Sequence, residues 1–250
     1  MVKFLFVVLA VIWVMVLGTE RLGYNWQWYR VPRYIFSFRD GGFTAGPLLQ
    51  GLMVTLRITG LSLVLSFVFG LATALLRLSD SVAARVLARG YVELTRNTPL
   101  LVQIFFIYFV LSPALGIGRF SSAVLALSLF EGAYSSEIFR SGIIAIPRGQ
   151  WEAAYSLGLS TLETYRAVIL PQAVRQILPP LANQAVSLIK DSALVSTIAI
   201  YDLTMQGEVI ISETYLTFEV WFAVAAIYLV LTTSISLLVR VMESRLTFPR

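Results

Sequence analysis

The sequence predicts an all-α integral membrane protein with about six transmembrane helices. Of its 250 residues, 58% are hydrophobic and only 13% are charged, and the mean hydropathy is +0.80. A soluble domain of this size has roughly a quarter of its residues charged. Several uncharged runs also approach the roughly 20 residues that a helix needs to cross a bilayer. The length leaves room for one membrane domain without a large soluble module.

The first predicted helix is the apolar run at residues 4–17, directly after Lys3. It is short for a span, and a signal peptide has a similar pattern, but we interpret it as an extra N-terminal transmembrane helix. Residues 19–47 are polar and aromatic, which suits an extracytoplasmic membrane interface. Residues 1–47 are therefore predicted to form this helix and an aromatic stretch, followed by the main membrane domain at residues 48–245.

Five further spans are predicted along that domain. They lie at residues 58–76, at residues 97–118 with the helix ending near Leu111, at residues 120–136, within residues 176–201, and at residues 220–239. Pro113 sets the expected end near Leu111, and Lys190 and Asp191 interrupt the fifth span. With the N-terminal helix, the count is six.

Charge predicts the orientation, because basic residues collect in cytoplasmic loops. If the N-terminus, the 77–97 loop, the 137–175 loop and the C-terminus share one side, that side holds twelve Lys and Arg residues and the other side five. Both termini are therefore predicted to face the cytoplasm, which requires an even number of spans. The net charge of +5 needs no nucleic acid to explain it.

Composition excludes several kinds of chemistry. The chain has no Cys and no His, so thiol chemistry, disulfides, a His-based acid or base and a His or Cys zinc site are excluded, and we expect no metal and no cofactor. It also lacks the G-x-x-x-x-G-K-[ST] phosphate loop of ATPases.

The loop at residues 140–175 is polar but well patterned. Good helix formers begin at Glu152, and Gly158 follows where a left-handed C-terminal cap is expected. Ser160 and Glu163 then have the spacing of a capping box, and the second helix is expected to stop at Pro171. From spacing alone, a structural connector and a docking element both remain open.

The same loop carries a gapped motif that resembles a known family. It consists of Glu152-Ala153-Ala154, then Gly158, then Val168-Ile169-Leu170-Pro171. This resembles the "EAA" loop of permeases from binding-protein-dependent ABC importers, although the family pattern has Ile at the position of Val168. The resemblance implies that Glu152, Ala153, Ala154, Gly158, Leu170 and Pro171 belong to a cytoplasmic coupling helix and its support, seated in a cleft of a separate ATPase subunit.

Flanking segments resemble the permeases for polar amino acids, which serve His, Glu, Gln, Arg and opines. The segments are residues 96–103, 132–140, 147–150 and 190–196, and the similarity covers residues 48–245. The resemblance implies a bacterial inner-membrane subunit, surrounded by lipid, that is not itself an enzyme. Its implied partners are an ATPase dimer that binds ATP-Mg, a second permease chain, identical or not, and a periplasmic or lipid-tethered binding protein.

Ionisable residues inside spans are costly and often functional, which singles out Asp191 and Glu131. The alternative for Asp191 is a pair with the neighbouring Lys190 or a position near water. In the resembling family, the fifth helix contributes to a substrate pocket. Asp191 would then hold the α-ammonium group of an amino acid, and Asn183 and Gln184 would hydrogen-bond its polar parts.

The expected substrate follows from the same resemblance. Relatives that move basic amino acids tend to have an acid near the position of Gln184, so the amide here favours glutamate, aspartate or glutamine. An anionic substrate would need a cation, which Arg57 or Lys190 can supply. The alternative for Arg57 is a side chain that extends to water at the membrane surface. Permeases for basic amino acids or opines remain the alternative.

Two further classes of function are weighed against a permease. An intramembrane aspartyl protease needs two facing carboxylates, which Glu131 and Asp191 provide nominally, but no catalytic motif accompanies them. A proton-driven secondary carrier works without an ATPase partner, and neither alternative accounts for the loop motif. A pure scaffold, a third possibility, would not need polar groups inside its spans.

Overall fold

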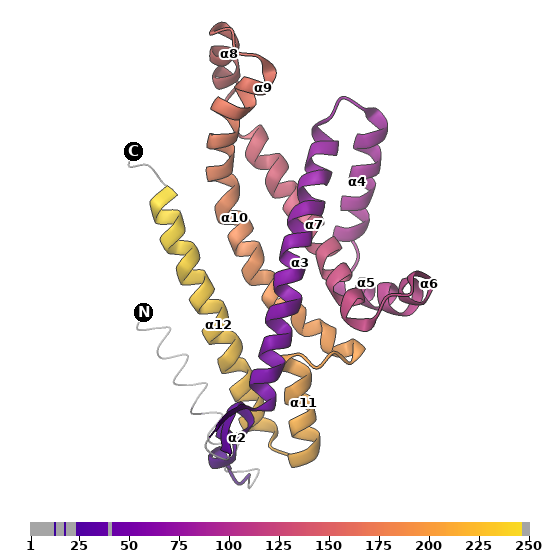
Figure 1. Ribbon diagram of the computed structural model, residues 1–250, viewed down its shortest axis with the longest axis vertical. Coiled ribbons are helices and arrows are strands. Elements are labelled where there is room, and N and C mark those ends of the chain that lie inside the picture. Colours follow the sequence, from indigo (N-terminus) through magenta and orange to yellow (C-terminus); the bar gives the residue numbers. More distant parts are fainter. Residues whose placement is uncertain (1–12, 14–17, 19–23, 40–41, 247–250) are drawn as a thin grey trace.

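The computed structural model describes residues 13, 18, 24–39 and 42–246. The predicted helix at residues 4–17 lies outside these residues apart from Trp13, so it stays a prediction. Within the described part, long helices run roughly side by side and one helical loop projects from an end of the bundle (Figure 1). The segments before the first long helix are η1 (Trp28–Arg30), α2 (Pro32–Ile35) and an antiparallel hairpin of β1 (Phe36–Arg39) and β2 (Gly42–Ala45).

The remaining elements are helical. In chain order they are α3 (Pro47–Leu78), α4 (Val82–Arg96), α5 (Leu100–Phe105), the π-helical η2 (Phe106–Leu111), α6 (Ser112–Leu115), α7 (Arg119–Ile144), α8 (Arg148–Ser156), α9 (Thr161–Thr164), the π-helical η3 (Tyr165–Ile169), α10 (Leu170–Asp191), the 3₁₀-helical η4 (Ser192–Ile198), α11 (Leu203–Thr214) and α12 (Thr217–Leu246).

Length and hydropathy identify the membrane spans. Among the described residues, α3 and the Thr217–Met242 part of α12 are each long and apolar enough to cross a bilayer. Two bent pairs pass the same test together, α4 with α5–α6 at 108° and Thr161–Ile198 with α11 at 49°. At 1.5 Å per residue, the 32 residues of α3 extend about 48 Å, more than the roughly 30 Å of a hydrocarbon core. The long helices therefore continue beyond the apolar layer.

Small side chains let α3 and α7 pack closely. On α3, Ser62, Ser66 and Gly70 recur every four residues and are buried, and Gly132 and Ser136 repeat the spacing on α7. A Cβ atom added at Gly70 would lie 2.7 Å from the Cβ of Ser135 on α7. Lipid is as apolar as the side chains, so no hydrophobic effect drives membrane helices together. They associate instead through small residues of this kind, which let the backbones pack closely.

The segment at residues 77–97 differs from its prediction. It was expected to be a loop, but only residues 79–81 and Asn97 in it are non-helical, and α4 folds back beside α3 (Figure 1). The Ser81 hydroxyl caps α4 by accepting a hydrogen bond from the Ala84 amide. Frequent charges hid this helix, because α4 buries Ala88, Val92 and Thr95 on one face and places its arginines elsewhere. A strongly amphipathic helix does not show as an uncharged run.

Two prolines do not end the helices that contain them. The helix expected to stop near Leu111 continues to Leu115 with Pro113 inside it, and the helix expected to stop at Pro171 continues into α10. In both cases a π-helical segment, η2 or η3, lies directly before the proline. A π-helical turn rearranges the hydrogen bonds around a proline that cannot donate one, and neighbouring helices support it.

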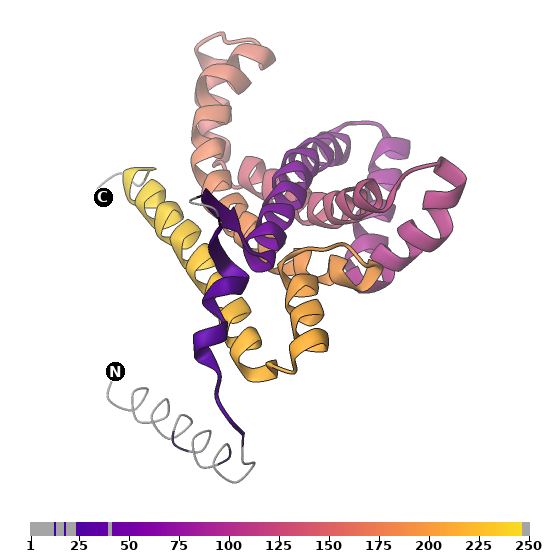
Figure 2. The same cartoon turned by 60° about the horizontal axis from the view of Figure 1, so that its bottom comes forward.

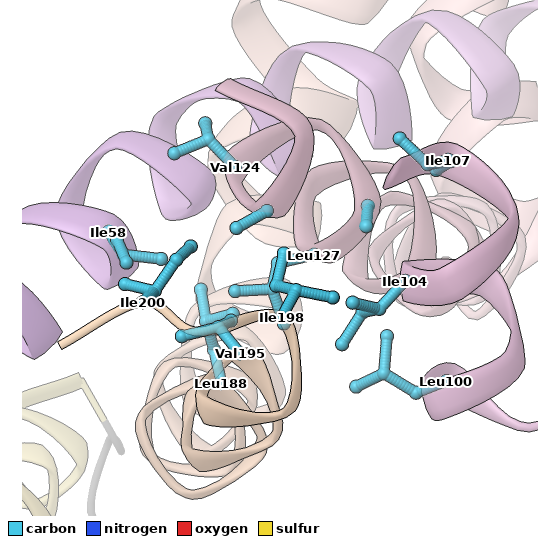
Figure 3. Close-up of a cluster of buried hydrophobic side chains, with 12 residues drawn as sticks. Ile58, Leu100, Ile104, Ile107, Val124, Leu127, Leu188, Val195, Ile198 and Ile200 are labelled. Carbon is cyan, nitrogen blue, oxygen red and sulfur yellow. The ribbon is translucent and has the colours of Figure 1, made fainter. Parts of the chain in front are cut away.

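The largest buried apolar cluster lies where α3, α5, α7 and the α10–η4 turn meet. Figure 3 shows Leu188, Val195 and Ile198 from the turn facing Leu127 of α7 and Ile104 of α5. The αL conformation of Ala199, at φ 56°, ends η4 and sends the chain back toward α11. This cluster fixes the end of α10 against α7, and it therefore positions the polar residues described below.

The aromatic stretch packs on the start of α12 (Figure 2). The Glu219 carboxylate, fully buried, accepts hydrogen bonds from the Tyr24 hydroxyl and from the Gln27 amide. Rings of Tyr24 and Trp26 contact Phe218 at centroid distances of 4.8 and 5.8 Å. The stretch is thus joined to the membrane domain by a buried carboxylate as well as by aromatic packing.

Candidate substrate and coupling sites

A buried carboxylate lies between α7 and α10. Glu131 is 1% exposed, and its Oε2 atom accepts a hydrogen bond from the Gln184 amide nitrogen. Its Oε1 atom has no hydrogen-bond partner within the described residues. A buried polar atom is normally satisfied, so this oxygen is available to a donor that the chain itself does not supply.

Asp191 brings a second carboxyl group to the same place. It lies seven residues after Gln184, which places both on one face of α10 two turns apart. The carboxyl groups of Asp191 and Glu131 lie close enough across the helix interface to affect each other's charge. Lys190 also acts on the Asp191 carboxyl through its charge, so the alternative pairing with Lys190 stays open. Glu131 of α7 thus forms one polar cluster, Glu131–Gln184–Asp191, with two residues of α10, the nearer of which is 53 positions away in sequence.

Apolar packing seals this cluster on one side. Leu127 lies one turn before Glu131 on α7, and Leu188 lies between Gln184 and Asp191 on α10, and both are at most 1% exposed. On the other side, Gln184 lines a largely apolar cavity of about 460 Å³ between α3, α10 and α12. The buried Glu131 carboxyl and the half-buried Asp191 carboxyl together need a cation or a proton. An ammonium group meets this need.

The other sequence-predicted substrate residues lie elsewhere. Asn183 is exposed, one position and about 100° around α10 from Gln184. Arg57 is exposed on α3, and no contact joins it to the polar cluster within the described residues. The structure therefore brings together Glu131, Gln184 and Asp191, but not Asn183 or Arg57.

Lys190 points away from the polar cluster into a groove between α10 and α12. The groove has a volume of about 340 Å³. It is lined by Val186, Lys190, Thr232, Thr233, Ser236, Leu237 and Arg240. Two cations and three hydroxyl groups suit an anion such as a carboxylate. Sequence reasoning missed the α12 side of this groove, although hydroxyl residues in an otherwise apolar span were a usable signal.

The predicted coupling loop is built as its sequence indicates. Helix α8 ends at Ser156, and Gly158 takes the left-handed conformation with φ 78°. The Gly158 amide donates to the carbonyl of Tyr155 and the Leu159 amide to that of Ala154, at 2.9 and 3.2 Å. This pair of bonds is the Schellman arrangement, which satisfies the last carbonyls of a helix.

The predicted capping box is also present at the start of α9. The Ser160 hydroxyl accepts from the Glu163 amide, and the Glu163 carboxylate accepts from the Ser160 amide at 2.9 Å. Hydrogen bonds from Ser160 lower the pKa of the exposed Glu163 carboxyl, because they favour its charged form. The loop therefore has a defined conformation at both of its joints.

The tip of this loop exposes groups suited to a protein contact. Glu152 is exposed on α8, and Leu157 and Leu162 are 81% and 77% exposed. Behind them, Trp151 packs edge-on against Tyr165 with centroids 5.0 Å apart, and Ala154 is buried. Figure 1 places α8 and α9 beyond the end of the long helices. Apolar side chains projecting outside the bundle favour a partner surface.

Metal binding has no support in the described residues, where no three His, Cys, Asp or Glu side chains gather as metal ligands.

Leu170 and Pro171, two of the predicted coupling residues, lie on the continuous helix from η3 to α10 rather than at its end.

Comparison with known proteins begins with a family model. Residues 66–248 match the family described as "Binding-protein-dependent transport system inner membrane component". The glutamine transport system permease protein of Escherichia coli is 41% identical over 202 residues, 80% of this chain and 92% of that protein. The nopaline permease of Agrobacterium fabrum is 41% identical over 207 residues, covering 78% and 86%. The L-cystine permease of Bacillus subtilis is 41% identical over 204 residues, covering 80% and 87%.

Solved structures agree. A crystal structure of an amino acid ABC transporter with histidines matches with a TM-score of 0.75 and 41% identity, covering 80% of this chain and 94% of that one. The inward-facing methionine ABC transporter matches with a TM-score of 0.67 at 20% identity, over 80% and 96%, and supports the fold.

Proposed function

Because the chain belongs to the family of inner membrane components of binding-protein-dependent transport systems, we propose that it carries glutamine, glutamate or aspartate across the inner membrane. The chain is a permease subunit of an amino acid ABC transporter and is not itself an enzyme. The transported amino acid is the proposed part. Its first candidate is glutamine, which the name of the Escherichia coli relative specifies for that protein.

The polar cluster carries the proposal. Glu131 and Asp191 receive the α-ammonium group, since the Oε1 atom of Glu131 is buried and without a partner within the described residues. Gln184 then exchanges its bond to Glu131 for one to the substrate's polar side chain. Lys190, in its groove beside α12, is placed to receive a carboxylate. The ammonium group and polar side chain of a neutral or acidic amino acid suit the polar cluster, whereas Lys190 faces a separate groove.

A basic amino acid is the second candidate, and a specific observation favours it. Two neighbouring carboxyl groups can bind an ammonium and still attract a second positive charge. The related transporter solved with histidines is named for such a ligand. The neutral amide of Gln184 is the feature that argues against it.

We further propose the assembly and orientation. Two permease chains work with an ATPase dimer on the cytoplasmic side, where α8 seats Glu152 and its neighbours in the ATPase. A binding protein delivers the substrate outside. ATP binding closes the ATPases, and the rigid loop transmits that movement to α7 and α10. The positive charge at the loop end supports this orientation.

The test is ATP hydrolysis by the reconstituted complex with its binding protein, over a panel of amino acids. We expect stimulation by one substrate class, and loss of the stimulation in Glu152→Ala. The matched control is Asp80→Asn, which removes an exposed acid from the α3–α4 turn at the same end of the bundle. Hydrolysis that ignores every amino acid, or an equal loss in both variants, would contradict the proposal.

A further inference from the structure

Four charged side chains meet where α3, α4 and α7 pack together, in the half of the bundle that carries α8 and α9. The Glu137 carboxylate of α7 pairs with Arg77 of α3, with Arg140 of α7 at 3.0 Å and with Arg96 of α4 at 3.7 Å. We call these residues the arginine cluster. Three guanidinium groups share one carboxylate, so the cluster carries two net positive charges. Its members come from three helices, and only the Glu137–Arg140 pair has a spacing that the sequence could have indicated.

Arg96 is the least satisfied of the three arginines. Its nitrogen lies 3.7 Å from the carboxylate, which is too long for a hydrogen bond, and its guanidinium lies over the Tyr134 ring at 5.3 Å from the centroid. The side chains of Arg96 and Arg140 are 44% and 33% exposed, whereas that of Arg77 is 13% exposed. Arg96 and Arg140 therefore keep donors that an outside acceptor can reach.

Exposed apolar side chains lie beside and above these donors. Leu94, two residues before Arg96 on α4, is 72% exposed, and Val86 and Leu87 are exposed nearer the α3–α4 turn. At the same end of the bundle, Leu75 and Leu76 of α3 are 56% and 46% exposed. In a membrane protein such side chains contact acyl chains. A ligand that meets both surfaces must combine an anionic head with a hydrocarbon tail.

We propose that the arginine cluster binds the phosphate of an anionic phospholipid. Guanidinium groups bind phosphate oxygens in a forked geometry, and basic pockets between membrane helices are known to bind lipid headgroups. Arg96 and Arg140 hold the phosphate, while Glu137 and Arg77 hold α3, α4 and α7 together beneath it. The acyl chains leave this site past Leu94, beside Arg96, and run away from the α3–α4 turn. In the orientation proposed above, the lipid belongs to the cytoplasmic leaflet.

The test is lipid retention by the purified transporter complex, measured by native mass spectrometry after incubation with phosphatidylglycerol or phosphatidylcholine. We expect the wild type to retain phosphatidylglycerol several-fold more than phosphatidylcholine. The preference should disappear in Arg96→Gln and persist in part in Arg96→Lys. The matched control is Arg89→Gln, which removes an equally charged, exposed side chain from α4 outside the cluster.

A gain of binding separates this proposal from a purely structural ion-pair network. Glu137→Gln removes the competing carboxylate and leaves three arginines for the phosphate, so retention of phosphatidylglycerol should rise several-fold. A structural network alone predicts weaker assembly and no gain. If Arg96→Gln does not assemble, Arg140→Gln provides the same comparison.

Three results would overturn the proposal. The first is equal retention of both lipids, and the second is an equal loss of phosphatidylglycerol retention in the Arg89 and Arg96 variants. The third is formation of a disulfide between an Arg96→Cys variant and a cysteine introduced into a partner chain. The last result would make the cluster a protein interface. None of these measurements depends on the transported amino acid, so a failure here is distinct from a failure of the proposed substrate.

Discussion

The coupling loop and the polar cluster are both polar regions attached to α7 and α10, but they are held together differently. In the loop, the caps at Gly158 and Ser160 use hydrogen bonds between residues no more than five positions apart. In the polar cluster, Gln184 contacts a residue 53 positions away, and no local bond fixes the arrangement. The loop is exposed, while Glu131 is 1% exposed.

This difference separates the two tasks of a transporter. A region that pushes on a partner needs a rigid shape in water, which local caps provide at low cost. A region that receives a charged substrate needs buried groups with incomplete bonding, and only surrounding helices can hold such groups in place. Changes in the polar cluster should therefore act on transport itself, and changes in the loop on its coupling to ATP hydrolysis.

The largest effect is expected from Glu131→Gln. This change keeps the shape of the side chain but removes the carboxyl group, so a bound ammonium group loses a buried partner. Losing one partner of a buried charge pair costs about 2 kcal/mol or more, which corresponds to a roughly thirtyfold loss of uptake. The measurement is amino acid uptake into proteoliposomes. Glu93→Gln, at an exposed position on α4, is the control. Wild-type uptake by Glu131→Gln would place the substrate route elsewhere.

The next effect concerns specificity. Gln184→Glu adds a third carboxyl group to the polar cluster, so a cationic substrate such as arginine should gain over glutamine by about tenfold, or about 1.4 kcal/mol. Competition between the two amino acids in the same uptake assay measures this shift. Asn183→Asp adds the same charge at the adjacent exposed position and should leave the preference unchanged. An equal shift in both variants would indicate a general charge effect and no contact with the substrate.

The sequence predicted the local structure of the coupling loop better than it predicted the polar cluster. The Gly158 cap and the Ser160–Glu163 capping box were readable because each depends on a few neighbouring residues. Glu131 and Asp191 were noticed singly as acids beside apolar runs, but their meeting depends on how α7 packs on α10. That packing rests on small residues and on the buried apolar cluster, whose members are far apart in sequence.

Errors in the fold have the same origin. A proline normally ends a helix. At Pro113 and Pro171 the helix continues, because a π-helical segment and neighbouring helices accommodate the proline. Helix α4 was taken for a loop because its frequent charged residues obscured the apolar face that packs on α3 and α7. The arginine cluster includes ion pairs between residues as much as 60 positions apart, and only its Glu137–Arg140 pair is local.

A smaller effect is expected in the loop. Gly158→Ala places a Cβ atom in empty space, so its only penalty is the left-handed backbone conformation, worth roughly 1–2 kcal/mol for an L-residue. We expect substrate-stimulated ATP hydrolysis to fall several-fold as the joint relaxes, with basal hydrolysis retained. Gly149→Ala, also in empty space but with helical geometry, should behave as wild type. If both variants lose stimulation alike, rigidity at Gly158 is not what transmits the movement.

The smallest effect concerns the capping box and depends on pH. Replacing a Ser N-cap by Ala usually costs roughly 1 kcal/mol, so Ser160→Ala should open the start of α9 without changing uptake measurably. The lowered pKa of Glu163 adds stability that is present above its unfolded pKa, about 4.3, and is lost as the pH falls through the lower folded pKa. Wild type and variant should thus differ most near neutral pH and converge in acid. Hydrogen exchange of the α9 amides, corrected for intrinsic rates, measures the difference. A difference that stays constant into acid would mean that the Ser160 hydroxyl acts alone and that the Glu163 carboxylate adds nothing to the loop.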